Sequence, residues 1–286
     1  MTGPLHRKIA VVTGAARGIG RAAAVALARA GADVVGVDIC AVVDLHSGVV
    51  PATPHDLRET GRLVEASGRR WLGITADQRD LPALRDVAAR VARELGGIDV
   101  LFANAGTQAF QPLLEMDDEH WRVHIDVNLT GTANAIRAFA PHIVQRGGGR
   151  IIVTTSTQGR HGTVLGAAYS ASKWGIIGLM KSAALELGRY GITVNAVVPG
   201  LIDTPLTRHQ ERYNQALVAA GKRPSGSAAD EDAARQVLAA ASPLGVPWIE
   251  PEAVAPVVVF LASDEARMVS GATYDVTAGD SAHYTA

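Results

Sequence analysis

The chain has 286 residues and only one cysteine, Cys40, so no disulfide can form within it. Aromatic residues make up 5% of the chain and charged residues 19%, and the formal net charge is -1. A balance this close to neutral argues against a general nucleic-acid or membrane-surface role, because such roles rely on clustered positive charge. No apolar run approaches the roughly 20 residues that span a bilayer, so no membrane insertion is expected.

Signals for export and for metal binding are also lacking. Residues 1–8 contain no apolar segment of the secretory kind. The nine histidines are scattered, none pairs convincingly as a ligand, and no metal is expected. With the single cysteine, these features predict a cytoplasmic protein. The 48% of hydrophobic residues suffices for the core of one large α/β domain over 1–286.

The start of the chain has a pattern typical of dinucleotide binding. A β-branched run over 8–13 predicts a strand, a glycine-rich turn follows, and an alanine-rich helix is expected over 21–30. Glycines let the backbone approach a pyrophosphate, and the helix N-terminus supplies free N–H groups and a positive dipole end. We therefore expect cofactor contacts from Gly14, Arg17, Gly18, Ile19 and Gly20.

Asp38 ends the second predicted strand, 33–39, roughly 20 residues beyond the glycine turn. An acid at this place accepts the adenosine ribose hydroxyls and repels a 2′-phosphate, which favours NAD over NADP. Arg17 favours the opposite choice, an NADPH-linked enzyme, because a basic residue in the turn can contact a phosphate. Asp38 carries more weight, since no arginine or lysine follows it directly.

Residues 40–55 interrupt the expected pattern. They have no clear period and contain two prolines, whereas a strand-to-helix connection is normally about 2–6 residues long. Because the segment leaves directly from Asp38, we interpret it as a flap over the adenosine side of the cofactor. A plain surface excursion is the alternative. Thr53 and Pro54 predict the N-cap and first residue of the next helix.

Strands and helices alternate along the rest of the chain. Strands are expected over 70–76, 98–103, 150–155, 192–198 and 273–276, and helices over 56–67, 81–95, 117–146, from Tyr169 to Tyr190 and over 251–263. This alternation predicts a single-domain, doubly wound Rossmann fold: a seven-stranded parallel sheet with helices on both faces. The helix over 117–146 should break at Asn128, because asparagine competes for backbone hydrogen bonds. We expect such a break to hold a water molecule beside Lys173. The alternative is that Asn128 is a structural amide whose hydrogen bonds are satisfied within the protein.

Ligands bind outside the carboxyl ends of parallel strands. The residues at those ends should therefore share one cofactor site: Asp38, Ile39, Asp77, Gln78, Asn104, Ala105, Gly106, Pro199 and Gly200. Asp77 is expected to accept from the adenine amino group, to cap the next helix, or to do both. Residues 203–246 break the alternation, and we interpret them as a mobile lid over the substrate. A long loop serving assembly is the alternative.

Ser156, Tyr169 and Lys173 have the chemistry of proton transfer. Tyr169 and Lys173 lie one helical turn apart on one face, and Ser156 follows a buried strand. A tyrosine pKa of about 10 must fall by about 3 units for base catalysis near neutral pH. An ammonium about 4 Å away supplies roughly that much at an effective dielectric of about 20. Tyr169 would then act as general acid/base, with Ser156 polarising the substrate oxygen. Amphipathic packing of Tyr169 beside a solvated Lys173 is the alternative.

The substrate should lie against loops that flank these groups, in contact with Gln108, Gln158, His161, Val164 and Leu165. The apolar members favour a hydrophobic alcohol, cyclic or terpenoid. Three functions fit: NAD-dependent oxidation of a secondary alcohol, NADPH-linked carbonyl reduction, or a non-catalytic NAD-binding scaffold. The intact trio of Ser156, Tyr169 and Lys173 favours an enzyme.

The chain resembles the short-chain dehydrogenase/reductase family over nearly its full length. The matching residues are Thr13, Gly14, Gly18, Gly20, Asn104, Ala105, Gly106, Asn128, Ser156, Tyr169, Lys173, Pro199 and Gly200. The resemblance implies that Tyr169 is the acid/base, that Ser156 orients the substrate oxygen and that Asn128 holds a relay water. It implies that Lys173 binds the nicotinamide ribose and lowers the Tyr169 pKa. It also implies carboxamide contacts from Ile202 and Thr204, and a homotetramer.

A narrower resemblance covers residues 37–40 with their insertion, 247–251 and 261–267. These stretches are similar to the carveol-dehydrogenase-like, mycofactocin-associated branch of that family. The chain departs from the branch at residues 199–202, where the branch more often has His-Pro-Thr. Membership would imply that the insertion covers a tightly held NAD, and turnover would then need an external electron acceptor.

Overall fold

Seven parallel strands form one sheet in the computed structural model, which describes residues 3–283. Their order is β3-β2-β1-β4-β5-β6-β7. The strands are β1 (Ile9–Thr13), β2 (Asp33–Asp38), β3 (Trp71–Thr75), β4 (Val100–Ala103), β5 (Gly149–Thr154), β6 (Ile192–Pro199) and β7 (Thr273–Val276). The order reverses between β1 and β4, which makes this the switch point of a doubly wound sheet. The predicted fold is confirmed.

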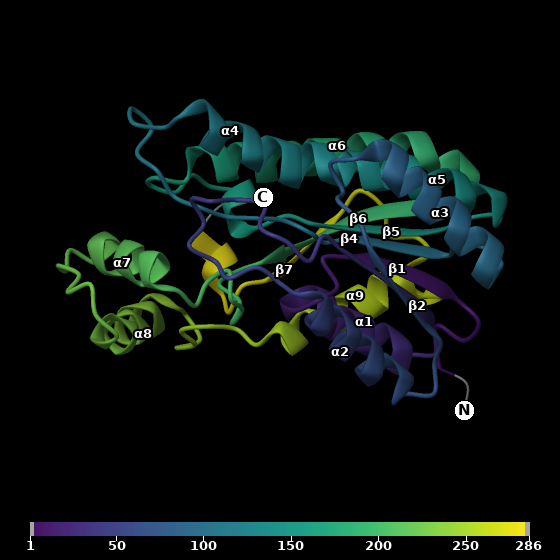
Figure 1. Cartoon of the computed structure of the whole chain (residues 1–286), viewed down its shortest axis with the longest axis horizontal. Helices are drawn as coiled ribbons and strands as arrows, with labels where there is room; N and C mark the ends of the chain where they lie inside the picture. Colours follow the sequence, from purple (N-terminus) through teal and green to yellow (C-terminus); the bar gives the residue numbers. More distant parts are fainter. Residues whose placement is uncertain (1–2, 284–286) are drawn as a thin grey trace.

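Helices cover both faces of the sheet (Figure 1). One layer contains α3 (Leu81–Leu95), α5 (Gly131–Gln145) and α6 (Ala167–Leu187), and the other contains α1 (Gly18–Arg29), α2 (Pro54–Glu65) and α9 (Ala255–Ala262). Successive strand residues face opposite layers, so Ile151 and Val153 join one core cluster and Ile152 joins the other. Both faces are buried, which explains why the strands are continuous apolar runs.

The helix starts show which capping expectations hold. Thr53 caps α2 by accepting from the Asp56 N–H, and the Asp56 carboxylate accepts from the Thr53 N–H in return. α3 begins and ends as predicted, but its cap is Asp80, whose side chain accepts from the Ala83 N–H. The expected capping role of Asp77 is therefore wrong, because Asp80 is the residue directly before the first turn.

The long helix expected over 117–146 is interrupted at the predicted place. It consists of α4 (Asp118–His124), a π-helical segment η1 (Ile125–Thr130) and α5. Asn128 lies inside η1, so the expected break is confirmed. A π-helical turn bonds five residues apart instead of four and is therefore wider than an α-helical turn. The Asn128 side chain reaches across to the backbone of Thr107, beyond the end of β4.

Two segments leave the carboxyl edge of the sheet, at the left of Figure 1. Residues 39–53 follow β2 without regular structure, and α7 (Gln210–Ala219) and α8 (Ala229–Ala241) form an arm after β6. The arm has its own small core around Tyr213 and Trp248. It reaches the loop after β2, because a Cβ added at Gly48 would lie 3.3 Å from the Glu211 carboxyl carbon.

Short helical turns complete the chain: η2 (Thr157–Gly159), η3 (Gly188–Tyr190), η4 (Pro251–Ala253), η5 (Asp264–Ala266) and η6 (Asp280–His283). Among residues 3–283, none of the helices combines the length and apolar character that a bilayer crossing requires. From the sequence we also expect the tail, 279–286, to reach a neighbouring subunit, and residues 284–286 of this tail lie outside the described residues.

The edge strand β3 contributes the indole ring of Trp71, which packs against three glycines. Trp71 lies against Gly36, Gly61 and Gly73, and a Cβ added at Gly36 would lie 2.0 Å from the Trp71 Cη2 atom. We expect Gly36→Ala to lower the free energy of unfolding by about 1–3 kcal/mol, because overpacking displaces the ring. Gly188→Ala is the control, since that glycine has helical angles and open space around it. Urea unfolding measures both variants, and a Gly36→Ala midpoint equal to that of the parent contradicts the prediction.

Candidate active site

A cavity of about 450 Å³ lies at the carboxyl edge of the sheet. Its lining includes residues that lie at the end of a strand or directly after it, among them Gly14, Asp38, Asn104, Thr154 and Pro199. Parallel strands bring these positions together at one edge, and ligands of such sheets bind there. The predicted strand-end residues Ile39, Asp77, Gln78, Ala105, Gly106, Gly200, Ile202 and Thr204 also line the cavity.

The glycine turn between β1 and α1 is tightly packed. Gly14 and Gly18 have φ of 67° and 56°, which favours glycine. A Cβ at Gly20 would lie 2.0 Å from the Gly14 carbonyl oxygen. Gly14, Arg17, Gly18 and Ile19 line the cavity, whereas Gly20 does not. Gly20 thus packs closely beneath the turn, and the cofactor contact expected of it stays a prediction.

Asp38 is held at the rim of the cavity by two backbone N–H groups. Its carboxylate accepts from Ala16 at 3.0 Å and from Cys40 at 2.9 Å. Arg17 donates to the Val50 carbonyl oxygen at 2.6 Å, so its guanidinium is bound to the loop after β2. Burial lowers the pKa of Arg17, and Asp38 acts in the opposite direction. The one basic residue of the turn thus already has a partner in the chain.

A hydrogen-bond network joins the ends of β1, β4 and β5. The Thr13 hydroxyl oxygen accepts from the Asn104 N–H at 3.0 Å and from the Ala105 N–H at 3.1 Å. The Asn104 side-chain oxygen accepts from the Thr154 hydroxyl at 3.2 Å. Gly106 follows, and a Cβ there would lie 3.0 Å from the Asn128 Oδ1 atom and 3.5 Å from the Lys173 Nζ atom. The small residue thus leaves room for two functional side chains.

Asn128 is fully buried and its amide is satisfied. Its oxygen accepts from the Thr107 N–H at 2.9 Å, and its nitrogen donates to the Thr107 carbonyl at 3.1 Å and to the Ser172 hydroxyl at 3.0 Å. Asn128 is not part of the cavity lining, although Val127 is. The side chain therefore matches the structural alternative, and the relay water stays a prediction.

Gln78 and Asp77 occupy the adenine side of the lining but have different surroundings. The Gln78 amide donates to the Ala105 carbonyl at 3.0 Å and the Val127 carbonyl at 2.7 Å, so it braces the loop after β4. Asp77 forms an ion pair with Arg79 at 2.7 Å. Its carboxylate still lines the cavity, so an adenine contact stays a prediction.

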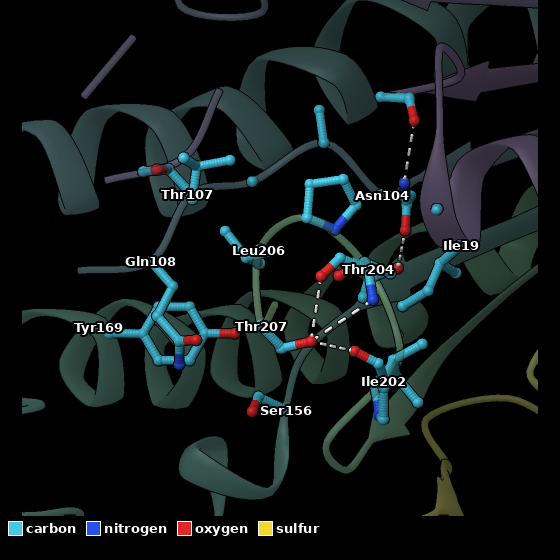
Figure 2. A pocket seen from close by; sticks show the side chains of 18 of the residues that line it. Ile19, Asn104, Thr107, Gln108, Ser156, Tyr169, Ile202, Thr204, Leu206 and Thr207 are labelled. Carbon is cyan, nitrogen blue, oxygen red and sulfur yellow. Dashed lines mark hydrogen bonds between the residues drawn. The ribbon is translucent and has the colours of Figure 1, made fainter. Parts of the chain in front are cut away.

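The phenol, ammonium and hydroxyl predicted for proton transfer lie together. Tyr169 and Lys173 share one face of α6, with the Lys173 Nζ atom 5.5 Å from the centre of the Tyr169 ring. Lys173 donates to the Thr154 carbonyl at 3.1 Å. The Ser156 side chain acts on the phenol and lowers its pKa. All three side chains are buried and line the cavity, and Figure 2 shows Ser156 and Tyr169 there.

Comparison with known proteins identifies the family. The family model for short chain dehydrogenases matches residues 8–215. The chain belongs to the short-chain dehydrogenase/reductase family. It is 38% identical to (-)-trans-carveol dehydrogenase of Rhodococcus erythropolis, over 95% of this chain and 96% of the relative. It is 36% identical to cis-4-hydroxycyclohexanecarboxylate dehydrogenase of Sinomonas cyclohexanicum, again over 95% of this chain and 96% of the relative.

A solved structure is similar along nearly the whole chain. The crystal structure of carveol dehydrogenase from Mycobacterium avium in complex with NAD superposes with a TM-score of 0.90 at 35% identity. The match covers 97% of this chain and 98% of that one. The predicted resemblance to carveol dehydrogenases within the short-chain dehydrogenase/reductase family is therefore confirmed.

The electrostatics of the phenol in this short-chain dehydrogenase differ from expectation. Burial raises the pKa of Tyr169 to about 12, while the Ser156 hydrogen bond and then the charge of Arg212 lower it. Burial also lowers the pKa of Lys173 to about 8. For the protein alone, the pKa of the phenol is thus raised and not lowered as expected, because desolvation is the largest influence on it.

The substrate side of the cavity is partly as predicted. Gln108, Gln158 and His161 line it. Val164 and Leu165 do not: Val164 is 81% exposed, and Leu165 has a φ of 67° in the loop before α6. Sequence reasoning missed the lining residues Asp44, Thr107, Leu206 and Arg212. They belong to irregular loops and the arm, where no periodicity or motif marked them.

The buried ammonium of Lys173 gives a pH-dependent stability. Its folded pKa of about 8 lies below the ordinary lysine value of 10.5, so the unfolded chain binds more protons between these values. Stability should therefore rise with pH from about 8 to 10, by up to about 1.4 kcal/mol per pH unit, relative to Lys173→Met. Urea unfolding of cofactor-free protein at several pH values measures this slope. Equal slopes for the parent and Lys173→Met would count against it.

Proposed function

We propose that the protein is an NAD-dependent oxidoreductase that interconverts a secondary alcohol and a ketone, with Tyr169 as general acid/base. The carrying observation is that Tyr169, Ser156 and Lys173 face the same cavity that the glycine turn and Asp38 border. A scaffold has no need for a buried phenol beside a buried ammonium, which is costly to desolvate. This arrangement favours an enzyme over the scaffold alternative.

The residues at the rim fit NAD. A carboxylate offers about four acceptor positions, and two backbone N–H groups of Ala16 and Cys40 occupy part of them at Asp38. The remaining positions suit the two ribose hydroxyls, and the negative charge disfavours a 2′-phosphate. Arg17, the residue that would favour NADPH, is bound to the Val50 carbonyl. The similar carveol dehydrogenase from Mycobacterium avium was crystallised with NAD.

The chain's own residues handle the proton and the orientation of the substrate. NAD, when bound, accepts the hydride and brings a positive charge. Ser156 donates a hydrogen bond to the substrate oxygen and orients it. The Tyr169 phenolate takes the hydroxyl proton as the ketone forms, and in the reverse direction the phenol returns it. The Lys173 ammonium, anchored on the Thr154 carbonyl, stabilises the phenolate.

Replacing the phenol tests this mechanism. We expect Tyr169→Phe to lower kcat by about 10²–10⁴-fold with NAD binding retained, because only the acid/base is removed. Tyr190→Phe is the matched control, since Tyr190 is 39% exposed at the far end of α6. NAD reduction with a panel of cyclic secondary alcohols measures the rates. Turnover by Tyr169→Phe at the parent rate would show that another group moves the proton.

The loop after β2 is proposed as a flap that closes over NAD. Asp44 is buried there and accepts from the Thr107 hydroxyl at 3.2 Å and from the His46 N–H at 2.9 Å. His46 also lies 3.7 Å from the Asp117 carboxylate. These contacts join the flap to the loop after β4 and to the start of α4. An enclosed NAD would leave slowly, and turnover would then use an external electron acceptor.

The flap is tested by removing its buried anchor. We expect Asp44→Ala to speed NAD dissociation by about tenfold or more, because hydrogen bonds to a charged group contribute about 1.5–3 kcal/mol. Leu45→Ala is the control, since this neighbour in the flap is 89% exposed. NAD release is followed by displacement with excess unlabelled nucleotide. Equal NAD release rates for Asp44→Ala and Leu45→Ala would show that the loop after β2 is a plain surface loop and not a flap over NAD.

A further inference from the structure

Arg212 of α7 is a cation that lines the cavity without an anionic partner. It and Arg17 are the two arginines in the described lining. The Arg212 Nε atom is buried and has no hydrogen-bond partner. Its Nη1 atom donates to Gln215 on the same helix, and no carboxylate within residues 3–283 forms an ion pair with it. Arg212 is partly buried, and a charge partly removed from water in this way is costly until an anion joins it.

The neighbouring arginine of the same arm shows the usual arrangement. Arg208 pairs with Glu231 at 2.6 Å and with Asp203 at 3.6 Å, and its guanidinium stacks on Trp248 at 4.3 Å. Arg235 shares Glu231 at 3.7 Å. The arm thus supplies carboxylates to its structural arginines and none to Arg212. The difference points to a ligand for Arg212 that is not part of the chain.

Arg212 is placed at the reacting end of the cavity. Its charge acts on the Tyr169 phenol, and the two residues line the same space. One face of the guanidinium lies on the Phe110 ring, with 4.9 Å between the guanidinium carbon and the ring centre. Stacking fixes the plane of the group. The acidic residues that line the cavity have other partners: Asp38 and Asp44 bind groups of the chain at the end of β2 and in the loop after it, Asp77 pairs with Arg79, and Asp280 lies beside His283.

We propose that Arg212 binds a carboxylate on the substrate, so that the preferred substrates are hydrophobic secondary alcohols, or the matching ketones, that also carry an acid group. A guanidinium pairs with a carboxylate through two parallel hydrogen bonds. One arginine suits a singly charged carboxylate better than a phosphate, which usually recruits several cations or a helix N-terminus. This inference rests on the proposed function and narrows its substrate class.

The rest of the substrate side suits the hydrocarbon part of such a molecule. Leu206, Leu238 and Val246 line the cavity from the arm, and Figure 2 shows Leu206 in the same view as Tyr169. The Sinomonas relative is named for a cyclic hydroxy acid, whereas the Rhodococcus relative is named for a neutral cyclic alcohol. Arg212 is the feature of this chain that favours the acid.

Turnover of a matched pair tests the proposal. The probes are 4-hydroxycyclohexanecarboxylate and its methyl ester, which share the reacting hydroxyl and the ring. For the parent we expect kcat/KM at least about tenfold higher with the acid, since charge-assisted hydrogen bonds are the strong ones. In Arg212→Gln the acid-to-ester ratio should fall to about one, and Arg212→Lys should lie between. Arg223→Gln, in the exposed loop between α7 and α8, removes the same charge and should keep the parent ratio.

The acid-to-ester ratio of kcat/KM distinguishes two roles of Arg212: binding of the substrate carboxylate, and an effect on the pKa of the Tyr169 phenol. If Arg212 only tunes Tyr169, Arg212→Gln slows acid and ester equally and the ratio is unchanged, which overturns the proposal. A parent that oxidises the ester as well as the acid also overturns it, while the proposed function stands. A parent that oxidises neither probe nor any alcohol of the wider panel argues against the proposed function, and the binding measurement then decides on Arg212.

Binding of a non-reacting acid supplies that second readout. Cyclohexanecarboxylate and cyclohexanecarboxamide are titrated calorimetrically into NAD-loaded protein. We expect the parent and Arg223→Gln to bind the acid at least about tenfold more tightly than the amide, and Arg212→Gln to lose this difference. Absence of acid binding to the parent, or equal acid binding by the parent and Arg212→Gln, overturns the proposal.

Discussion

The site depends on one constraint: a lysine ammonium must be buried beside a phenol at the point where several strands end. Lys173 is 4% exposed, and the Thr154 carbonyl is the protein group to which it donates. Thr154 in turn donates its hydroxyl to Asn104, which is held by Thr13. A shift of any of these strands would move the ammonium. The register of β1, β4 and β5 is therefore part of the catalytic geometry.

The two irregular segments act on this framework from outside. The loop after β2 is anchored through Asp44 to Thr107, the same residue whose backbone binds Asn128. Asn128 reaches Thr107 because the π-helical turn displaces it from an α-helical position. The loop after β2 and the side chain of Asn128 thus meet at one residue, Thr107. In the proposed mechanism, a change in the flap would reach the neighbourhood of Lys173 through these two side chains.

The parallel, doubly wound sheet and the residues at its strand ends were predictable, because buried parallel strands have long apolar runs and ligands bind at their carboxyl ends. The break at Asn128 was predictable because an asparagine side chain in the middle of a helix competes for backbone hydrogen bonds. The positions of Val164 and Leu165 outside the cavity lining were not, because side-chain direction in a loop depends on backbone angles that no period encodes. Asp44 and Arg212 were missed for a related reason. Each acts through a partner distant in sequence, Thr107 for one and Phe110 for the other.

The direction of the Tyr169 pKa shows why proximity alone is a poor guide to acidity. A neighbouring ammonium attracts a phenolate, but burial lowers the pKa of that ammonium to about 8, so its charge is lost above that pH. The remaining cation, Arg212, keeps its charge because a guanidinium deprotonates only at much higher pH. An anion on Arg212 would reduce its pull on the phenol, and the positive charge of NAD would then favour both the phenolate and a charged substrate. In the proposed mechanism, acid recognition and proton transfer are therefore coupled through the guanidinium of Arg212.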